Sequence, residues 1–555
     1  MLQKVGILFL VLSILSVHNL QSQVTIGSAE KPNSGAILDL KEKNDGTGGM
    51  TATKGLLLPR VNLSKKNSLF PMFGKLGDET NGYDTDKTNI DNMHTALVVY
   101  NLWTDLDEGL CPGTYVWLSD TWERFPEPCP TPLKIEDSPN SYIVASNGGS
   151  IEVPCGKPYL VSQKRSDVAS VNLTDLVTLE FLWQDKQDLI DNVELVTENK
   201  GPYSKFKVTT KSGTGNALVA VRMGPTGTSA DPIVWSWHIW VTDYNPNSPS
   251  GTDKVYSHNN GEKAYTFMDR NLGAIGTTKT DVGVIGLTYQ WGRKDPFSSS
   301  GDFSPETEFR NLYALDNSLL TEKDEIQATP PGDGTGIKHE LATNALSGAT
   351  NNLSRSIQNP MTFFFGIYES SYKALNWYNI DDNTTTVGDN ELWASIGGKS
   401  DFDPCPEGWR VPAYSGTKSP WANFEGANNW GEYPSAYVKS DATRNGVNLI
   451  ANGSVFTELG FYPFSNHRRP RQYYISGPVG SSTSYGTGGA FLDGNFIDGN
   501  DKSILLWTAN GSSSAAEAKA LWLHMNYSGL MDSPDSKIEN HSRAAGAFVR
   551  CVHVD

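Results

Sequence analysis

The chain has 555 residues, of which 38% are hydrophobic and only 19% are charged. The length suggests roughly three or four domains, and the composition is that of a folded protein. The net charge of −17 disfavours nucleic acid or an anionic membrane as the main partner, because both require a basic surface. Fifty-three Gly and 30 Pro predict many turns and short strands rather than long helices.

Residues 1–23 have the order of charge and apolarity expected of a secretory signal peptide. Lys4 precedes the apolar stretch Val5–Val17, and a polar exit follows at His18–Gln23, with cleavage expected near Ser22 or Gln23. The apolar stretch is too short to span a bilayer. No Cys precedes Cys111, so we expect export without N-terminal lipidation and retention at the cell surface, or in a fimbrium, by another protein.

Residues 24–132 are expected to form an N-terminal β module. Short apolar runs bounded by Gly, Pro and Asn predict buried strands at Ala36–Leu40, Gly55–Leu58 and Ala96–Tyr100. The runs Tyr115–Leu118 and Thr121–Phe125 are separated by two turn residues, which predicts a tight hairpin.

Residues 133–245 have the spacing of an immunoglobulin-like β-sandwich. Short apolar runs alternate with Gly-rich turns, and the run Val234–Val241 is apolar on both faces, which predicts a strand buried on both sides. In residues 246–555, aromatic clusters are separated by long Gly, Ser, Asn and Asp segments, which predicts one large loop-rich domain. The predicted fold class is therefore mainly β, with an α+β C-terminal part.

Five cysteines are expected to be oxidised where they can pair, because the protein is exported. Cys111 and Cys129 flank the Trp-rich hairpin, and we expect them to pair. Cys405 and Cys551 stand at the two ends of a long block, and a bridge between them would add on the order of 4–5 kcal/mol in the chain-entropy model. Cys155 is then left as a candidate buried free thiol.

Several strings resemble those of a known family. Phe267–Ala274 and Tyr289–Phe297 resemble large surface proteins of the Bacteroidetes, while Asp403–Pro412 and Gly546–Val552 resemble the Fibrobacter succinogenes major paralogous domain. That domain is similar to the C-type lectin-like fold, in which the chain ends meet and are tied. The overall plan also resembles accessory tip subunits, of the E class in particular, of the Porphyromonas-type major fimbrium. The resemblance implies other tip subunits and host matrix proteins as partners.

No pattern in the sequence indicates an enzyme. The nine His residues are scattered without the spacing of a metal-ligand array, and no nucleophile elbow or phosphate-binding loop occurs. Formylglycine-generating enzymes share the lectin-like fold but need paired active-site cysteines, whereas Cys405 and Cys551 are better explained by a structural bridge. We therefore expect a non-catalytic protein without a cofactor, apart from calcium.

A calcium site is one interpretation of the acidic loop that begins at Asp493. Asp493, Asn495, Asp498 and Asp501 supply the oxygen ligands that calcium prefers. The same residue types also form ordinary turns, and the loop lacks EF-hand spacing, so turn formation is the favoured alternative.

A basic run stands out in this acidic protein. Arg468, Arg469, Arg471 and Tyr473 are of the types favoured at binding hot spots, which suggests a contact loop for an acidic partner. The alternative, and the one we favour, is a solvated surface loop.

Two functions follow from these observations. The leading hypothesis is a cell-surface adhesion protein, a virulence-associated tip component of a fimbrium, that binds host matrix or partner cells through protein contacts. The alternative is a glycan-binding surface protein that captures polysaccharide.

Overall fold

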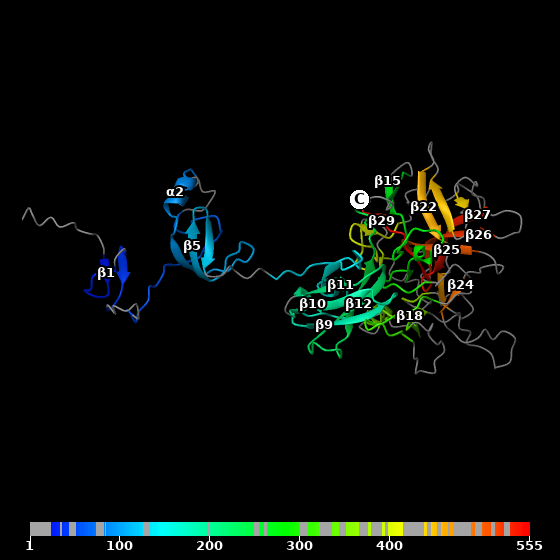
Figure 1. The fold of residues 1–555 in the computed structure, drawn as a ribbon, viewed down its shortest axis with the longest axis horizontal. Helices are drawn as coiled ribbons and strands as arrows, with labels where there is room; N and C mark the ends of the chain where they lie inside the picture. Colours follow the sequence, from blue (N-terminus) through cyan, green and yellow to red (C-terminus); the bar gives the residue numbers. More distant parts are fainter. Residues whose placement is uncertain are drawn as a thin grey trace, which may run out of the picture. The chain divides into compact units, whose positions relative to one another are not determined.

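The chain folds into two compact units, residues Met1–Leu133 and Lys134–Asp555, in a computed structural model. We call them the N-terminal unit and the C-terminal unit (Figure 1). The structure describes residues 24–33, 36–43, 51–73, 83, 85–125, 133–196, 199–248, 255–259, 264–299, 309–321, 336–342, 351–365, 376–378, 391–393, 398–413, 438–440, 446–451, 457–463, 467–470, 490–493, 502–511, 517–526 and 533–554. The described structure is mainly β with few helices, as the composition predicts. Its helices are all too short or too polar to cross a lipid bilayer.

The described part of the N-terminal unit contains a pair of parallel strands, a four-stranded sheet and the helix α2. In the sheet the strand order is β3-β4-β5-β6, while β1 pairs only with β2. The elements of this unit are β1 (Val24–Ile26), β2 (Leu38–Leu40), β3 (Arg60–Val61), α2 (Lys87–Met93), β4 (Val98–Asn101), β5 (Gly113–Leu118) and β6 (Thr121–Phe125).

The predicted hairpin is confirmed. Leu118 pairs with Thr121 across the turn, and Ser119 takes a positive φ of 65°, which lets the chain reverse within two residues. Trp117 and Trp122 project from the two strands into a shared core with a ring-centroid distance of 5.2 Å. The Trp117 indole donates to the Asp91 carbonyl, which fixes α2 against the sheet.

Two predicted buried strands of the N-terminal unit are corrected by the structure. Leu38 and Leu40 lie in β2 but expose 53% and 40% of their surface. The run Gly55–Leu58 is not a strand, and Leu56 and Leu57 are 68% and 76% exposed. Periodicity identifies apolar runs but not the surface that covers them. Nothing within the described part of this chain covers these side chains fully.

The first part of the C-terminal unit contains two sheets that enclose a hydrophobic core. Their strand orders are β10-β11-β8 and β7-β13-β12-β9. The Phe206 ring from β11 and the Trp237 ring from β13 meet between the sheets at 5.4 Å. The elements are β7 (Ser141–Val144), β8 (Ser150–Pro154), α3 (Lys157–Lys164), β9 (Leu176–Gln184), β10 (Ile190–Leu195), η1 (Gly201–Tyr203), β11 (Lys205–Thr210), β12 (Gly215–Gly224) and β13 (Ile233–Val241).

Every residue of β13 is buried, as predicted from its two apolar faces. Trp237 points to the neighbouring sheet, whereas Ser236, His238 and Trp240 contact residues from beyond position 245. The segments expected as a sandwich domain (133–245) and as a lectin-like domain (246–555) therefore share one hydrophobic core.

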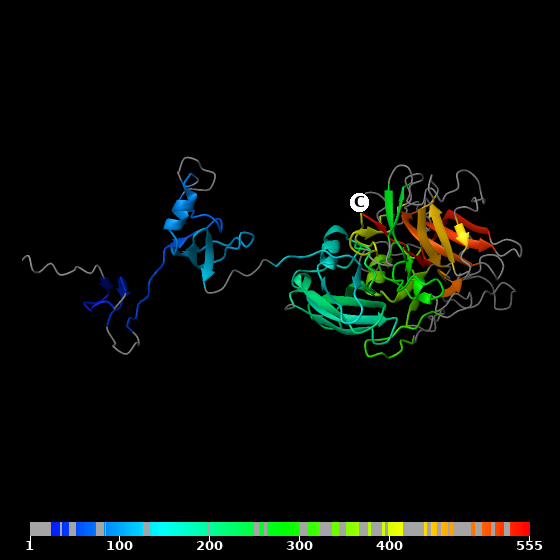
Figure 2. The same ribbon diagram turned by 45° about the horizontal axis from the view of Figure 1, so that its top comes forward.

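The rest of the C-terminal unit is built from short strands. A four-stranded sheet has the order β14-β15-β29-β19, and a seven-stranded sheet contains β24-β23-β28-β25-β26-β27 with β16 paired to β28. In two views, the sheets of residues 141–241 and the orange and red strands β24–β27 lie at opposite sides of the unit (Figures 1 and 2). The beginning and the end of this part lie in one sheet, because β14 pairs with β15 and Phe267 of β15 pairs with Val552 of the last strand, β29.

The remaining elements complete the described structure. They are β14 (Val255–Asn259), β15 (Ala264–Met268), η2 (Val282–Val284), β16 (Thr288–Gln290), β17 (Lys338–Leu341), α4 (Asn352–Gln358), β18 (Thr362–Phe365), β19 (Trp409–Arg410), β20 (Val438–Ser440), β21 (Gly446–Ala451), β22 (Thr457–Pro463), β23 (His467–Pro470), β24 (Ala490–Asp493), β25 (Lys502–Gly511), β26 (Glu517–Asn526), β27 (Ser533–Ser542), β28 (Gly546–Phe548) and β29 (Val552–His553).

Candidate functional site

The acidic loop predicted to hold calcium lies mostly outside the described residues. Asp493 is the last residue of β24 and its side chain is not described, while Asn495, Asp498 and Asp501 fall outside the described ranges. Elsewhere in the described ranges, no group of three or more His, Cys, Asp or Glu side chains is placed to hold a metal ion. The calcium interpretation stays a prediction.

The basic run is partly described and lies beside the start of the acidic loop. Arg468 and Arg469 are in β23, which pairs antiparallel with β24, so that His467 is opposite Asp493. The structure therefore places the backbone of Asp493 beside the described part of the basic run. The side chains of β23 are not described, and Arg471 and Tyr473 lie outside the described residues.

The cysteine predictions agree with the structure where it can be described. Cys405 and Cys551 form a disulfide with their Cα atoms 6.0 Å apart, and Cys155 is a buried free thiol. Cys111 is itself disulfide-bonded, while its predicted partner Cys129 lies outside the described residues.

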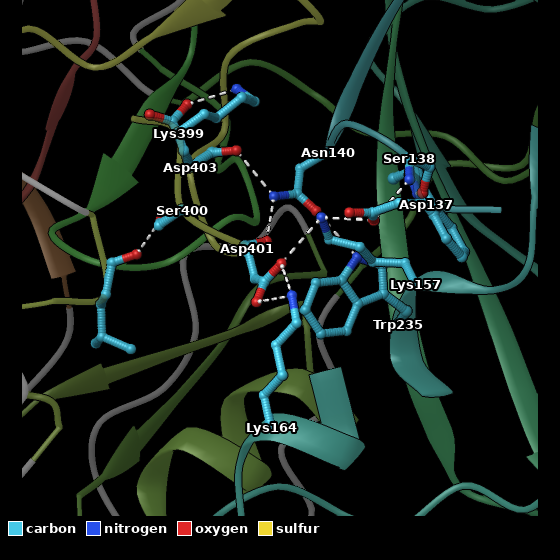
Figure 3. Close-up of polar contacts among 12 residues, drawn as sticks. Asp137, Ser138, Asn140, Lys157, Lys164, Trp235, Lys399, Ser400, Asp401 and Asp403 are labelled. Atoms are coloured by element: carbon cyan, nitrogen blue, oxygen red, sulfur yellow. Dashed lines mark hydrogen bonds and ion pairs between the residues drawn. The ribbon is translucent and has the colours of Figure 1, made fainter. Parts of the chain in front are cut away.

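A buried polar group joins the start of the C-terminal unit to the segment before the disulfide. We call it the polar seam, and its central residue is Asn140 (Figure 3). The Asn140 amide donates to the carbonyls of Asp401 and Asp403, both at 2.8 Å, and accepts a hydrogen bond from the Trp235 indole at 3.0 Å. Because Asn140 is 1% exposed, all three hydrogen bonds are shielded from water.

Two lysines of α3 add charge to the polar seam. Lys157 lies 2.9 Å from Asp137 and 3.5 Å from Asp401, and Lys164 lies 3.1 Å from Asp401. Figure 3 shows Asp401 between the two ammonium groups. Lys157 is buried, so its pairing with carboxylates offsets the cost of removing its charge from water.

Asp403 holds the segment that contains Cys405. Its carboxylate accepts from the Cys405 amide at 2.9 Å, the Val411 amide at 2.8 Å and the Lys399 ammonium at 2.8 Å. Lys399 also donates to the Cys405 and Trp409 carbonyls. Burial lowers the pKa of Lys399, and the carboxylate of Asp403 opposes that shift. The arrangement fixes one end of the disulfide in position.

His238 lies at the centre of a second buried network. Its Nε2 is 2.9 Å from the Asn216 side-chain oxygen, and its Nδ1 is 3.0 Å from the Ser141 hydroxyl and 3.4 Å from the Tyr289 hydroxyl. Ser141 donates to the Pro404 carbonyl. The Asn216 oxygen only accepts, so Nε2 carries the proton and Nδ1 accepts from a hydroxyl. Burial lowers the pKa of His238 to about 3, so the ring is neutral.

Ser236, Lys294 and Asp295 form a compact trio that resembles a nucleophile, base and acid. The Asp295 carboxylate accepts from both Ser236 and Lys294, and the Lys294 ammonium lies 4.8 Å from the centre of the Trp235 ring. All three residues are at most 3% exposed. Because the Ser236 hydroxyl is buried, a substrate could not reach it in this arrangement. The contacts of the trio instead link β13 to the segment that follows β16.

The N-terminal unit carries a site of another kind, an exposed apolar surface. Side chains between 39% and 77% exposed occur on β1 and β2, on α2, on the four-stranded sheet and on the segments between these elements: Val24, Ile26, Ile37, Leu38, Leu40, Leu56, Leu57, Met93, Tyr100, Leu102, Trp103, Leu118 and Phe125.

One comparison with known proteins bears on this surface. Residues 25–138 match the family described as phage tail like trimerisation region. The match covers the described N-terminal unit almost completely and about a fifth of the chain. No curated protein and no solved structure matches the chain.

Sequence reasoning did not find either the polar seam or the exposed apolar surface. Asn140 and Asp403 are 263 residues apart, and no local pattern marks them as partners. The apolar runs Ala36–Leu40 and Gly55–Leu58 were visible, but their pattern is the same for burial within one chain and for burial between chains.

Proposed function

We propose that this protein is a cell-surface adhesion protein that acts as a homotrimer. The N-terminal unit joins three copies, and the C-terminal unit of each copy is the part presented to host matrix or partner cells. The observation that carries the proposal is the similarity of residues 25–138 to a trimerisation region, on the same unit that exposes a set of apolar side chains.

The physical argument for association is the cost of exposed apolar area. Burial of apolar surface stabilises a complex by about 25 cal/mol per Å² before the entropy of association is subtracted. Soluble monomers rarely expose large contiguous apolar patches. An assembly of identical copies buries these side chains without a dedicated partner protein, and closed point-group symmetry limits its size.

The C-terminal unit has the properties expected of a rigid presenting head. The Cys405–Cys551 bridge, the polar seam and the shared core hold its segments together. Its paired sheets support an immunoglobulin-like interpretation of residues 133–245. The pairing of β15 with the last strand, β29, supports a C-type lectin-like interpretation of residues 246–555. The resemblance to accessory fimbrial subunits supports the adhesive role.

Adhesion by a trimer predicts avidity, because a second or third head binds a surface at high effective concentration. The test measures binding of the purified full chain to immobilised host matrix proteins and to whole bacterial cells. It uses protein concentrations above and below the one at which the trimer dissociates. We expect the apparent affinity to fall on the order of 10²-fold when the trimer dissociates. Absence of binding to both surfaces would contradict the adhesive role.

A further inference from the structure

The two-stranded sheet of the N-terminal unit has one apolar face and one polar face. β1 and β2 are parallel, and Val24 pairs with Leu38, Thr25 with Asp39 and Ile26 with Leu40. Side chains alternate between the faces of a strand, so this register places four apolar side chains on one face. We call it the front face, and its residues are Val24, Ile26, Leu38 and Leu40.

The front face is open to solvent although it is wholly apolar. Its four side chains are 51%, 56%, 53% and 40% exposed, in that order. No charged residue lies among them. A pair of three-residue strands has too little packing to be stable alone, and parallel strands occur almost only where sheets are covered. The pair therefore needs a partner on this face.

On the opposite face, Asp39 and Lys41 have polar contacts within the chain. The Asp39 carboxylate accepts from the Asn33 amide at 2.8 Å and lies 2.9 Å from the Lys41 ammonium. These contacts hold the pKa of Asp39 below its ordinary value. Lys41 also donates to the Lys31 carbonyl. Among the described residues of β1 and β2, the side chains of the front face are the exposed ones, whereas Thr25 and Asp39 are partly buried.

We propose that the front face is the contact between copies of this chain, and that three front faces meet around the threefold axis of the assembly. This inference rests on the proposed trimer and assigns it a surface. The front face lies within the residues similar to a trimerisation region. An uncharged, flat set of Val, Ile and Leu is complementary to itself, and rotation about a threefold axis brings three identical sets together. Asp39 and Lys41 then face away from the axis.

The first test uses two substitutions at neighbouring positions of β1. Ile26→Lys introduces a charge on the front face, and Thr25→Lys introduces the same charge on the opposite face, beside Asp39. The oligomeric state of each full-length variant is measured by sedimentation velocity. We expect Ile26→Lys to shift the protein to monomer, with at least a tenfold weaker association, and Thr25→Lys to remain trimeric like the wild type.

The second test uses cross-linking and does not introduce a charge. Ile26→Cys places three thiols near the axis, so mild oxidation is expected to give covalent dimers on a non-reducing gel. Thr25→Cys is the matched control and is expected to give none. This measurement keeps the proposal testable if Ile26→Lys fails to fold.

The possible outcomes distinguish a wrong assignment of the contact surface from a wrong proposal of the trimer itself. A trimeric Ile26→Lys variant, or an Ile26→Cys variant that stays uncrosslinked in a trimeric protein, would overturn the front face as the contact and leave the trimer standing. Loss of the trimer in Ile26→Lys without cross-linking of Ile26→Cys would show that the chain's own residues cover the face. A monomeric wild-type protein would overturn both proposals.

Discussion

Cys405 and Cys551 are bonded to each other across 146 residues of chain, and Asp403 accepts a hydrogen bond from the Cys405 amide beside this bridge. The covalent link and the polar seam therefore act on the same segment. One closes the long loop, and the other attaches the start of that loop to Asn140 and the first sheets of the unit. This relationship predicts that the C-terminal unit unfolds as a whole.

Removing the bridge is expected to destabilise the C-terminal unit strongly. In the chain-entropy model, a loop of this length contributes about 5 kcal/mol. The Cys405→Ser/Cys551→Ser variant should therefore unfold at a much lower denaturant concentration, as measured by tryptophan fluorescence. Cys155→Ala is the control, because it removes a buried thiol without opening a loop and should cost about 1 kcal/mol. Equal unfolding midpoints for the wild type and the double variant would contradict this account.

Asn140→Ala is expected to weaken the contact between the sheets of residues 141–241 and the segment around Asp403. The substitution leaves two carbonyls and the Trp235 indole without their partner in a buried site. Unsatisfied groups of this kind cost about 1–3 kcal/mol each, so a loss of about 3 kcal/mol in the free energy of unfolding is expected. Asn192→Ala, at an exposed position of β10, should change it by less than about 0.5 kcal/mol. A similar small effect at Asn140 would show that the seam is not structurally important.

His238 predicts a specific dependence of stability on pH. Its pKa is lowered to about 3 in the folded protein, against an ordinary value of 6.5. Between these values the unfolded chain binds a proton that the folded chain does not. The contribution of neutral His238 to the free energy of unfolding is therefore fully present above pH 6.5. It is lost as the pH falls towards 3, by up to about 1.4 kcal/mol per pH unit.

The measurement compares thermal unfolding of the wild type and of His238→Gln between pH 7 and pH 4. The glutamine amide can donate to Asn216 but does not titrate. The wild type should lose stability with acid more steeply than the variant. Parallel curves would contradict a neutral, buried His238.

The sequence predicted those parts of the fold that depend on local pattern. The Ser119-Asp120 turn specifies the hairpin, and the alternating apolar faces of Val234–Val241 specify a strand covered on both sides. Patterns of this kind report burial but not the identity of the covering surface. The predictions for Leu38 and Leu40 were wrong for this reason, because the structure leaves these apolar side chains largely exposed.

Contacts between distant residues were not predictable in the same way. The hydrogen bonds of Asn140 and of His238 depend on how the whole unit closes, because their partners lie far away along the sequence or on other strands. The Cys405–Cys551 bridge was predictable because few cysteines are present, which leaves few ways to pair them.

The most direct test of the account is the mass of the protein in solution, measured by sedimentation equilibrium over a range of micromolar concentrations. The account predicts three times the mass of one chain at the upper end of that range. A single-chain mass at every concentration would contradict it.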